Sequence, residues 1–497
     1  MTGVAMSKHK SGISRMQTVL LPATLDDYAA LSSMVRVIDE YVARLDLVGL
    51  GFTHSVAAPT GAPGYGAGDL LKLYLYGYWN RIPHSRQLET ECRRNVEVMW
   101  LLGQLTPCFK TIAAFRAANR RAFEDACAQF VEFMREIQLV GGKLPMVAVD
   151  GSKFKACAAK RSVLTQEQLE RERQRIQKRI GRYLEEMDEA DAHDPGVPEL
   201  APEQVEAALE KLRQRDKKLE QAQVELAQRA QAAAPDQTPR VSLTDPDAVL
   251  LTGNGGQALA GYNVQQAVDT EHGFIVAHEV TTLRNDHASL EPMALQAQEA
   301  LEAATLSVLS DSGYANAAQA QACEARGIVP VVPMPQPSQT RAAGAYPKTM
   351  FSYDPDSDTY RCPAGETLTR YKRDRKLQTD YYRTQACEHC PLRANCTHSR
   401  GRTITRSWFA DAAERAHERA RTHPQLMRLR AATAEHPFGN LKAMLRGGFC
   451  LRTLAKVKGE MALAVLAYNL KRALKVLGTD EFLERLWMHT VWSASAA

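Results

Sequence analysis

The sequence predicts an α/β protein with a helical N-terminal region and two inserts in its core. Short apolar runs end at Asp150 and at Asp311, which is typical of buried strands that end at a sheet edge. Residues 164–232 are rich in Glu, Gln, Arg, Lys and Ala, and residues 334–424 hold closely spaced cysteines. A chain of 497 residues is long enough for several such units.

The composition is that of an ordinary globular protein, with 45% hydrophobic and 24% charged residues. A net charge of +5 identifies no partner, so charge must be interpreted locally. No apolar run is long enough to span a bilayer, and the N-terminus lacks the apolar core of a signal peptide. We therefore expect a cytoplasmic protein without a membrane partner, whose closely spaced cysteines favour metal over disulfides.

Residues 1–20 are expected to form a flexible arm, and residues 21–140 a helical domain. Apolar residues recur at helical spacing from Asp26, and a second helix is expected from Asp69. Eight Lys or Arg face three Glu between Arg81 and Arg121, a balance that suits DNA phosphates. The alternative is a solvated face whose arginines pair with nearby glutamates. The predicted phosphate contacts are Arg81, Arg86, Arg93, Arg94 and Lys110.

Residues 141–163 and 240–335 are expected to form an α/β core. A strand ends at Asp150, and GYNVQQAVD and FIVAHEVTT read as a β-hairpin turning at residues 270–273. Helices over 286–304 and 315–325 flank the strand that ends at Asp311. A last strand over 328–333 contains prolines, which predicts a sheet edge. With a late helix over 425–446, this is the element order of a ribonuclease-H-like fold.

Residues 164–239 are expected to form an inserted helical hairpin and a linker. Leu169, Ile176 and Ile180 belong to one apolar stripe, and Leu212 and Leu219 to a second. Residues 190–202 break the pattern between them. We interpret the hairpin as a structural insert, with self-association as the alternative.

Residues 336–424 are expected to form a cysteine-rich insert. Two of its cysteines form a Cys-x-x-Cys knuckle, and two more lie within reach. Four thiolates suit a structural zinc ion, with a reduced, metal-free cluster as the alternative and His389 and His398 as substitute ligands. The predicted zinc ligands are Cys362, Cys387, Cys390 and Cys396.

Two strand-end aspartates and a helical glutamate, Asp150, Asp311 and Glu435, suit a pair of Mg²⁺ or Mn²⁺ ions, because hard cations prefer carboxylate oxygens. Glu435 lies in residues 425–475, the helical end of the core, and residues 476–497 are expected to be a C-terminal tail. Arg428 and Lys442 each lie seven residues from Glu435 and should share its helix face, with a kink near Thr433 caused by Pro437. Taken singly, Asp311 could be a helix cap and Glu435 a surface residue.

Four motifs, VAVDGSKFKA, GYNVQQAVDTEHGFIVAHEVT, LSDSGY and EHPFGNLK, together resemble the DDE transposases of bacterial insertion sequences, in the branch numbered eleven eighty-two. The residue 65–103 segment resembles the helical domain that precedes their catalytic core. By this resemblance Asp150, Asp311 and Glu435 are the catalytic triad, followed by Lys442. Related families place Arg four residues before the glutamate. Ala431 stands there in this chain, so Arg430 or Arg428 is expected to position phosphate instead.

The resemblance implies a transposase that binds the ends of its insertion sequence and catalyses Mg²⁺-dependent DNA strand cleavage and transfer. Its partners would be the terminal repeats, the target DNA and at least one further copy of the chain. The alternatives are a catalytically inactive or repurposed DNA-binding relative and a stand-alone ribonuclease-H-like nuclease. Three intact acids argue against the first, and the basic helical domain argues against the second.

Overall fold

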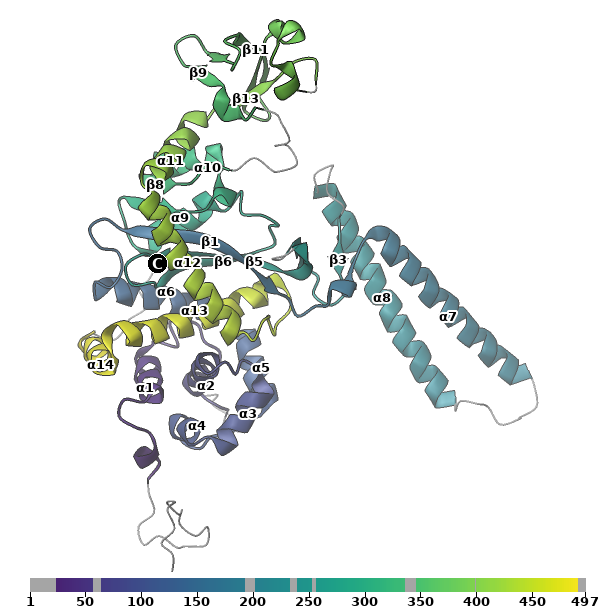
Figure 1. Ribbon diagram of the computed structural model, residues 1–497. Coiled ribbons are helices and arrows are strands. Elements are labelled where there is room, and N and C mark those ends of the chain that lie inside the picture. The colour runs from purple at the N-terminus through teal and green to yellow at the C-terminus, as the bar shows by residue number, and fades with distance from the viewer. Residues whose placement is uncertain are drawn as a thin grey trace, which may run out of the picture.

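A computed structural model describes residues 24–56, 64–192, 202–232, 239–252, 256–335, 346–397 and 399–489. The predicted arm of residues 1–20, the central part of the hairpin break at 190–202 and His398 lie outside these ranges. Figure 1 shows a central sheet covered by helices, a long helical hairpin to one side and a small second sheet at the far end. None of the helices within these ranges is long and apolar enough to cross a membrane.

The central sheet is mixed and contains the predicted strands. Its order is β4-β5-β1-β7-β8, with β6 paired to β5. Strands β1, β7 and β8 run parallel to one another, and β5 runs antiparallel to β1. The hairpin of β5 and β6 is confirmed, and the proline-containing β8 lies at an edge as predicted. The bounds are β1 Met146–Lys155, β4 Val249–Thr252, β5 Ala258–Asp269, β6 Ile275–Thr281, β7 Leu306–Leu309 and β8 Ile328–Val331.

Helices cover the sheet and continue to the C-terminal end of the chain. Helix α12 is continuous through Pro437, although this residue lacks the N–H that would bond to the Thr433 carbonyl. The segment expected to be a tail contains α14, whose Phe482 and Leu486 are buried. The bounds are α9 Leu290–Ala300, α10 Ala317–Ala325, α11 Ala410–Thr422, α12 Pro424–Met444, α13 Leu454–Leu477 and α14 Thr479–Met488.

The N-terminal helices share one continuous hydrophobic core with the sheet. Helix α13 packs against α2 and α6 as well as β6. A buried ion pair reinforces this contact, because the Arg116 guanidinium lies 3.5 Å from the Glu460 carboxylate. The bounds are η1 Leu25–Tyr28, α1 Met34–Arg44, α2 Ala67–Trp79, α3 Ser85–Arg94, α4 Val96–Leu101, α5 Phe109–Ala118 and α6 Arg120–Glu136.

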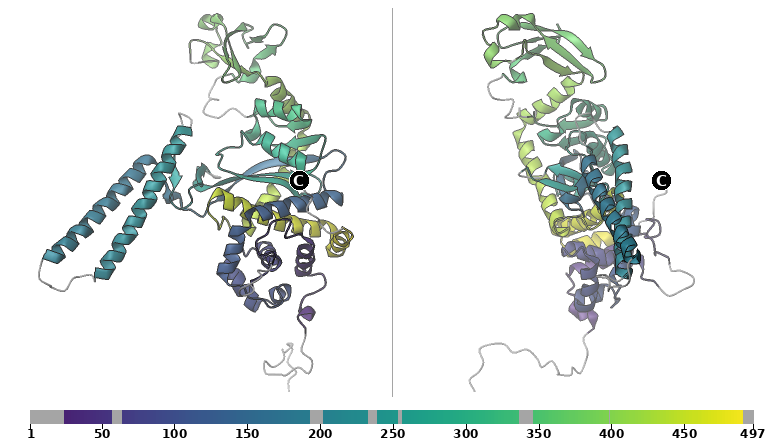
Figure 2. Two further views of the ribbon diagram at one scale, coloured as in Figure 1. Left: turned by 180° about the vertical axis from the view of Figure 1, so that it is seen from behind. Right: turned by 90° about the vertical axis from the view of Figure 1, so that its right-hand side faces the viewer.

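The first insert is an antiparallel pair of helices, α7 Gln166–Ala192 and α8 Pro202–Ala232. It has a small core of its own, which includes Leu169, Ile176, Leu219 and Leu226. Strands β2 Val163–Leu164 and β3 Val241–Ser242 pair at its base. Figure 2 shows that the hairpin stands away from the rest of the molecule, which agrees with the structural insert predicted from its stripes.

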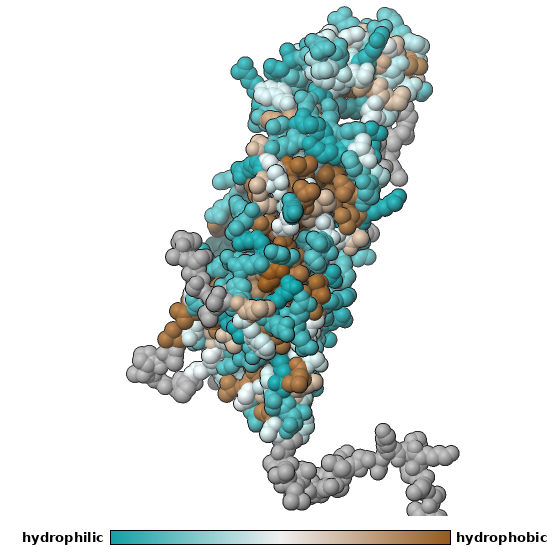
Figure 3. Space-filling view, turned by 90° about the vertical axis from the view of Figure 1, so that its left-hand side faces the viewer, coloured by the Kyte–Doolittle hydropathy of each residue, from teal (hydrophilic) through white to brown (hydrophobic). Residues whose placement is uncertain are grey.

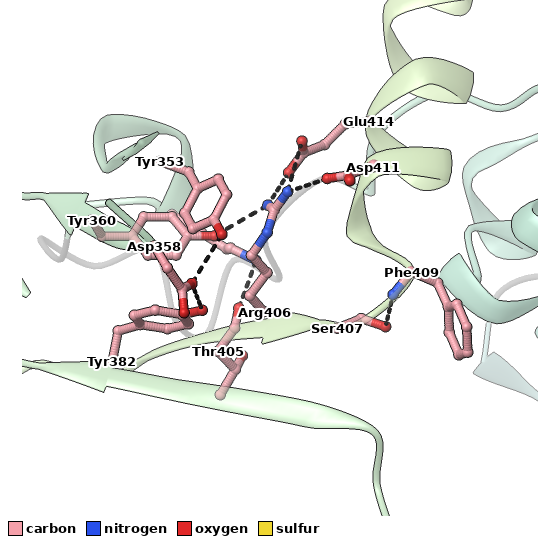
Figure 4. Close-up of polar contacts among 11 residues, drawn as sticks. Tyr353, Asp358, Tyr360, Tyr382, Thr405, Arg406, Ser407, Phe409, Asp411 and Glu414 are labelled. Atoms are coloured by element: carbon pink, nitrogen blue, oxygen red, sulfur yellow. Dashed lines mark hydrogen bonds and ion pairs between the residues drawn. The ribbon is translucent and has the colours of Figure 1, made fainter. Parts of the chain in front are cut away.

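The second insert is a five-stranded antiparallel sheet in the order β13-β12-β11-β10-β9. Its strand β13 leads into α11 through Arg406, whose guanidinium bonds Glu414 and Asp411 and lies over the Tyr353 ring (Figure 4). Because Arg406 touches both the small sheet and α11, it fixes the orientation of one on the other. Strand bounds are β9 Ser352–Asp354, β10 Thr359–Arg361, β11 Thr367–Asp374, β12 Thr379–Arg383 and β13 Ile404–Ser407.

The face in Figure 3 is largely polar, with apolar side chains gathered near the middle of the molecule. Single exposed apolar side chains are common on soluble proteins, and the described part of the chain has several, such as Leu144.

Candidate active site

Asp150 and Asp311 meet because their strands are parallel neighbours. Ala148 of β1 pairs with Leu309 of β7, so each aspartate lies two residues beyond this matched pair. Arg430 of α12 reaches both acids. One of its terminal nitrogens lies 2.8 Å from Asp150 Oδ1 and 3.6 Å from Asp311 Oδ2. The two predicted aspartates therefore face one shared cation.

The two aspartates differ in exposure. The Asp150 side chain is 15% exposed and the Asp311 side chain 46%. Burial raises the pKa of Asp150 from 3.8 to about 6, and the charges of Asp311 and Asp286 act in the same direction. The positive charge of Arg430 and the Gly151 N–H oppose this rise. Asp311 also accepts a hydrogen bond from the Gly313 N–H at 2.8 Å, as the cap of a short 3-10 turn, so its cap role and a site role are compatible.

Glu435 lies on α12 and is exposed. The preceding Ala434 is buried, and its carbonyl accepts a hydrogen bond from the Gln266 side chain at 2.9 Å. Gln266 is the register partner of Asp150 across β1 and β5. The helix is thus fixed to the sheet beside Asp150 at the residue before Glu435. The Glu435 carboxylate itself forms no hydrogen bond or ion pair with the part of the chain that the structure describes.

Lys442 contacts the same strand as Asp150. Its Nζ donates to Ser152 Oγ at 2.6 Å and lies 5.4 Å from the centre of the Phe154 ring. Burial lowers the pKa of Lys442, whereas the charge of Asp150 raises it, which indicates that the two groups interact. Arg428 is exposed on α12. Of the two arginines expected to position phosphate, Arg430 is therefore the one in contact with the aspartates.

Asp286 is an acid beside this site that the sequence reasoning missed. Its Oδ1 accepts hydrogen bonds from Asn263 Nδ2 at 2.8 Å and from Gln265 Nε2 at 2.6 Å. A Cβ at Gly151 would lie only 2.6 Å from this oxygen, so the glycine after Asp150 leaves room for the approach. The signal in the sequence was the amides Asn263 and Gln265 inside an otherwise apolar strand, since buried amides need partners.

Carboxylates at this site fit hard divalent ions by donor type, because Mg²⁺ and Mn²⁺ prefer carboxylate oxygens. The Arg430 nitrogen between Asp150 and Asp311 shows that the two carboxylates can face one positive charge. Within the described ranges, however, no three His, Cys, Asp or Glu side chains are placed to hold a metal ion. Glu435 or Asp286 would have to supply the third carboxylate.

The four predicted zinc ligands lie together in the small sheet. Cys362, Cys387, Cys390 and Cys396 all line one cavity of about 20 Å³. Each of the four is a free thiol. Burial raises the pKa of Cys396, the charge of Arg402 lowers it, and the three other cysteines raise it further. The donor set therefore fits a tetrahedral zinc ion, although as placed the thiols are not in ligating geometry.

The predicted DNA-binding side chains of the helical region have different surroundings. Arg93 and Arg94 pair with Glu89 and Glu91, and Arg86 lies over the Phe109 ring. Arg81 and Lys110 are exposed and form no ion pair with any described carboxylate. Local pairing therefore accounts for Arg93 and Arg94, and phosphate binding stays a prediction for the cluster.

Two models of known protein families match parts of the chain. Residues 236–470 match the transposase DDE domain, which spans β4 to β8, the second insert and α12. A second model, the transposase domain DUF772, matches residues 24–118. No curated protein and no solved structure matches the chain significantly.

A transposase DDE domain implies a ribonuclease-H-like core. The sheet, with three parallel strands beside an antiparallel hairpin, contains the strands of the predicted element order. The two matches support the predicted transposase family. The matched region contains Asp311, Glu435 and Lys442, whereas Asp150 lies before it on β1.

Proposed function

We propose that the chain is the transposase of an insertion sequence in the branch numbered eleven eighty-two, which binds the element's ends and cuts and transfers DNA strands. The convergence of Asp150 and Asp311 on Arg430, in a chain with a transposase DDE domain, carries this proposal. In this proposal the protein acts in the cytoplasm as a homodimer or larger assembly, on terminal repeats and target DNA.

In this proposal the acidic and the basic residues have different roles. Asp150, Asp311 and Glu435 hold the divalent ions. When bound there, two Mg²⁺ ions supply Lewis-acid chemistry that favours attack of water or a DNA 3′-hydroxyl on a phosphodiester. Lys442 and Arg430 bind and orient the phosphate, since both are cationic donors near Asp150. Arg430 is paired with both carboxylates, and it would be available to a phosphate if a divalent ion took its place there.

The zinc site is a second part of the proposal. Four thiolates from Cys362, Cys387, Cys390 and Cys396 hold one structural zinc ion that organises the small sheet. Its support is the shared cavity, together with the few buried apolar residues in that sheet, Phe351, Tyr360, Leu368, Tyr382 and Ile404.

The test is strand cleavage by the full chain. The protein is incubated with Mg²⁺ or Mn²⁺ and duplex DNA from the ends of its own element, and nicked strands are separated on a denaturing gel. Asp150→Asn should abolish cleavage and leave DNA binding nearly intact, because the acid repels phosphate. Asp356→Asn, an exposed change in the small sheet, is the matched control and should cleave like wild type.

Two outcomes would overturn the proposal in different ways. Cleavage by Asp150→Asn at the wild-type level would mean that other residues hold the metal. Binding of terminal DNA by the wild type without cleavage would identify an inactive, repurposed relative instead.

A further inference from the structure

A cavity of about 650 Å³ lies where the N-terminal helices meet the end of α12. The turn after α2 contributes Arg81, helix α3 contributes Gln87, Glu91 and Arg94, and the end of α12 contributes Arg446. We call it the interdomain groove, because its walls come from the residue ranges that the two transposase models match. Figure 1 shows α12 running from the sheet toward these N-terminal helices.

Positive charge in the interdomain groove is only partly balanced. The single glutamate, Glu91, has a side chain 8% exposed and lies 2.5 Å from an Arg94 nitrogen. Its other oxygen accepts a hydrogen bond from Asn95. Neither Arg81 nor Arg446 forms an ion pair with a carboxylate in the described ranges. Two positive charges in the groove are therefore available to an anionic partner.

The wall that carries Arg446 is held in place. Arg446 adopts a left-handed backbone with φ 48° at the end of α12, and its Nη1 donates to Gln87 Oε1 at 3.1 Å. Three residues later the Phe449 N–H bonds to the Lys155 carbonyl at the end of β1 at 2.9 Å. The groove is thus attached both to α3 and to the strand that carries Asp150.

The interdomain groove also lies close to the candidate active site. Arg446 follows Lys442 by four residues, in the turn just beyond the end of α12 at Met444. Lys442 in turn bonds Ser152, which lies two residues beyond Asp150. A polyanion in the groove could therefore continue to the aspartates past a row of cationic side chains.

We propose that the interdomain groove binds the sugar-phosphate backbone of duplex DNA next to the strand-cleavage site, with Arg81 and Arg446 each contacting a phosphate. This inference rests on the proposed function and adds to it a DNA contact that includes a residue outside the predicted basic cluster. Guanidinium groups suit the task because their fork of N–H donors matches phosphate oxygens. The groove's position between two domains suits an extended partner more than a small free anion.

The test measures the salt dependence of binding between the full chain and a short fluorescein-labelled duplex of arbitrary sequence, by fluorescence anisotropy. Loss of one phosphate contact lowers the slope of log K against log salt by about 0.9. Arg446→Gln and Arg81→Gln should each show this loss, and Arg446→Lys should restore most of it. Arg121→Gln removes an equal charge from α6 outside the groove, and its slope should stay at the wild-type value.

A structural control separates charge from shape. Gln87→Ala removes the hydrogen-bond partner of Arg446 but no charge, so it should lower the slope by less than Arg446→Gln does. Equal slopes for wild type, Arg446→Gln and Arg81→Gln would overturn the proposal that the groove binds DNA, while leaving the proposed function intact. Displacement of the duplex by an equal concentration of pyrophosphate would overturn it too, as the groove would then be a small-anion site. Groove-dependent binding without cleavage of terminal DNA would instead overturn the proposed function alone.

Discussion

The ion pair between Arg116 of α5 and Glu460 of α13 should be the main polar bond between the N-terminal helices and the catalytic core. Arg116 is 4% exposed and Glu460 is fully buried. At 3.5 Å and an effective dielectric constant of about 20, the attraction is about 5 kcal/mol. Removing one partner leaves the other charge buried, so each single change should cost about 3–5 kcal/mol of unfolding free energy.

The two single variants should not cost the same. In Arg116→Met, Glu460 keeps the backbone N–H groups of Cys450 and Leu451 as donors, so the loss should fall at the lower end of this range. In Glu460→Gln, the new amide places an N–H beside these donors and beside Arg116. The loss of unfolding free energy in Glu460→Gln should therefore fall at the upper end of this range, because the N–H of the buried amide then lacks an acceptor.

The assay is guanidinium unfolding of the full chain, followed by tryptophan fluorescence and by far-UV circular dichroism. The double variant Arg116→Met/Glu460→Gln should cost less than the sum of the singles by about 2–3 kcal/mol. Arg121→Met breaks an exposed pair with Asp125 and should change stability by less than about 0.5 kcal/mol. Single losses below about 1 kcal/mol, or strict additivity, would refute the reasoning, since the buried charges would then be solvated or independent.

Three further predictions concern the two sites. In EDTA, Asp150→Asn should stabilise the protein above pH 6 by up to about 3 kcal/mol and should not stabilise it below pH 4. The reason is that the pKa of Asp150 is about 6 in the folded protein against an ordinary value of 3.8, so that ionising this carboxyl costs folding free energy. Thermal melts measured over a pH series check this prediction. The purified chain should contain one zinc ion per molecule by atomic emission. Cys390→Ser should lower the zinc content, and Cys157→Ser should leave it unchanged. A wild-type protein without zinc would contradict the site. Gly151→Ala should lower cleavage and destabilise by about 1–3 kcal/mol, since its Cβ would lie 2.4 Å from Gln265 Nε2, whereas Gly142→Ala meets no atom within 4 Å and should do neither.

Local pattern predicted the parts of the fold whose residues are close in sequence. The apolar runs before Asp150 and Asp311 predicted β1 and β7, whereas the parallel pairing of these strands comes from the structure. The C-terminal helix α14 was missed because a short amphipathic stretch is marginal by itself. Its Phe482 and Leu486 are stabilised as helix by burial against the core, which no local pattern shows.

The parts of the candidate site that could not be predicted depend on contacts between residues that are far apart in the sequence. The position of Asp311 just after β7 was predictable, whereas the strand predicted to end at Asp150 continues to Lys155, where β1 is held by its pairing with β5. Arg430 between the two aspartates was not predictable, because it depends on which face α12 turns to the sheet. That face is set by Ala434, a small residue whose carbonyl meets Gln266 across the interface. Asp286 was missed for a related reason, since its approach requires the absence of a side chain at Gly151.

Helix α12 links the two halves of the proposed chemistry in one rigid element. Arg430 lies at the aspartates, Lys442 reaches β1, and Arg446 lines the interdomain groove. Arg430 lies fourteen residues before the end of α12 at Met444, about 21 Å of helix, and Arg446 follows two residues later. Because Ala434 bonds the sheet at one end and Phe449 bonds Lys155 just beyond the other, this distance cannot vary without breaking a contact to the core. The helix therefore fixes how far the proposed DNA contact lies from the proposed cleavage site.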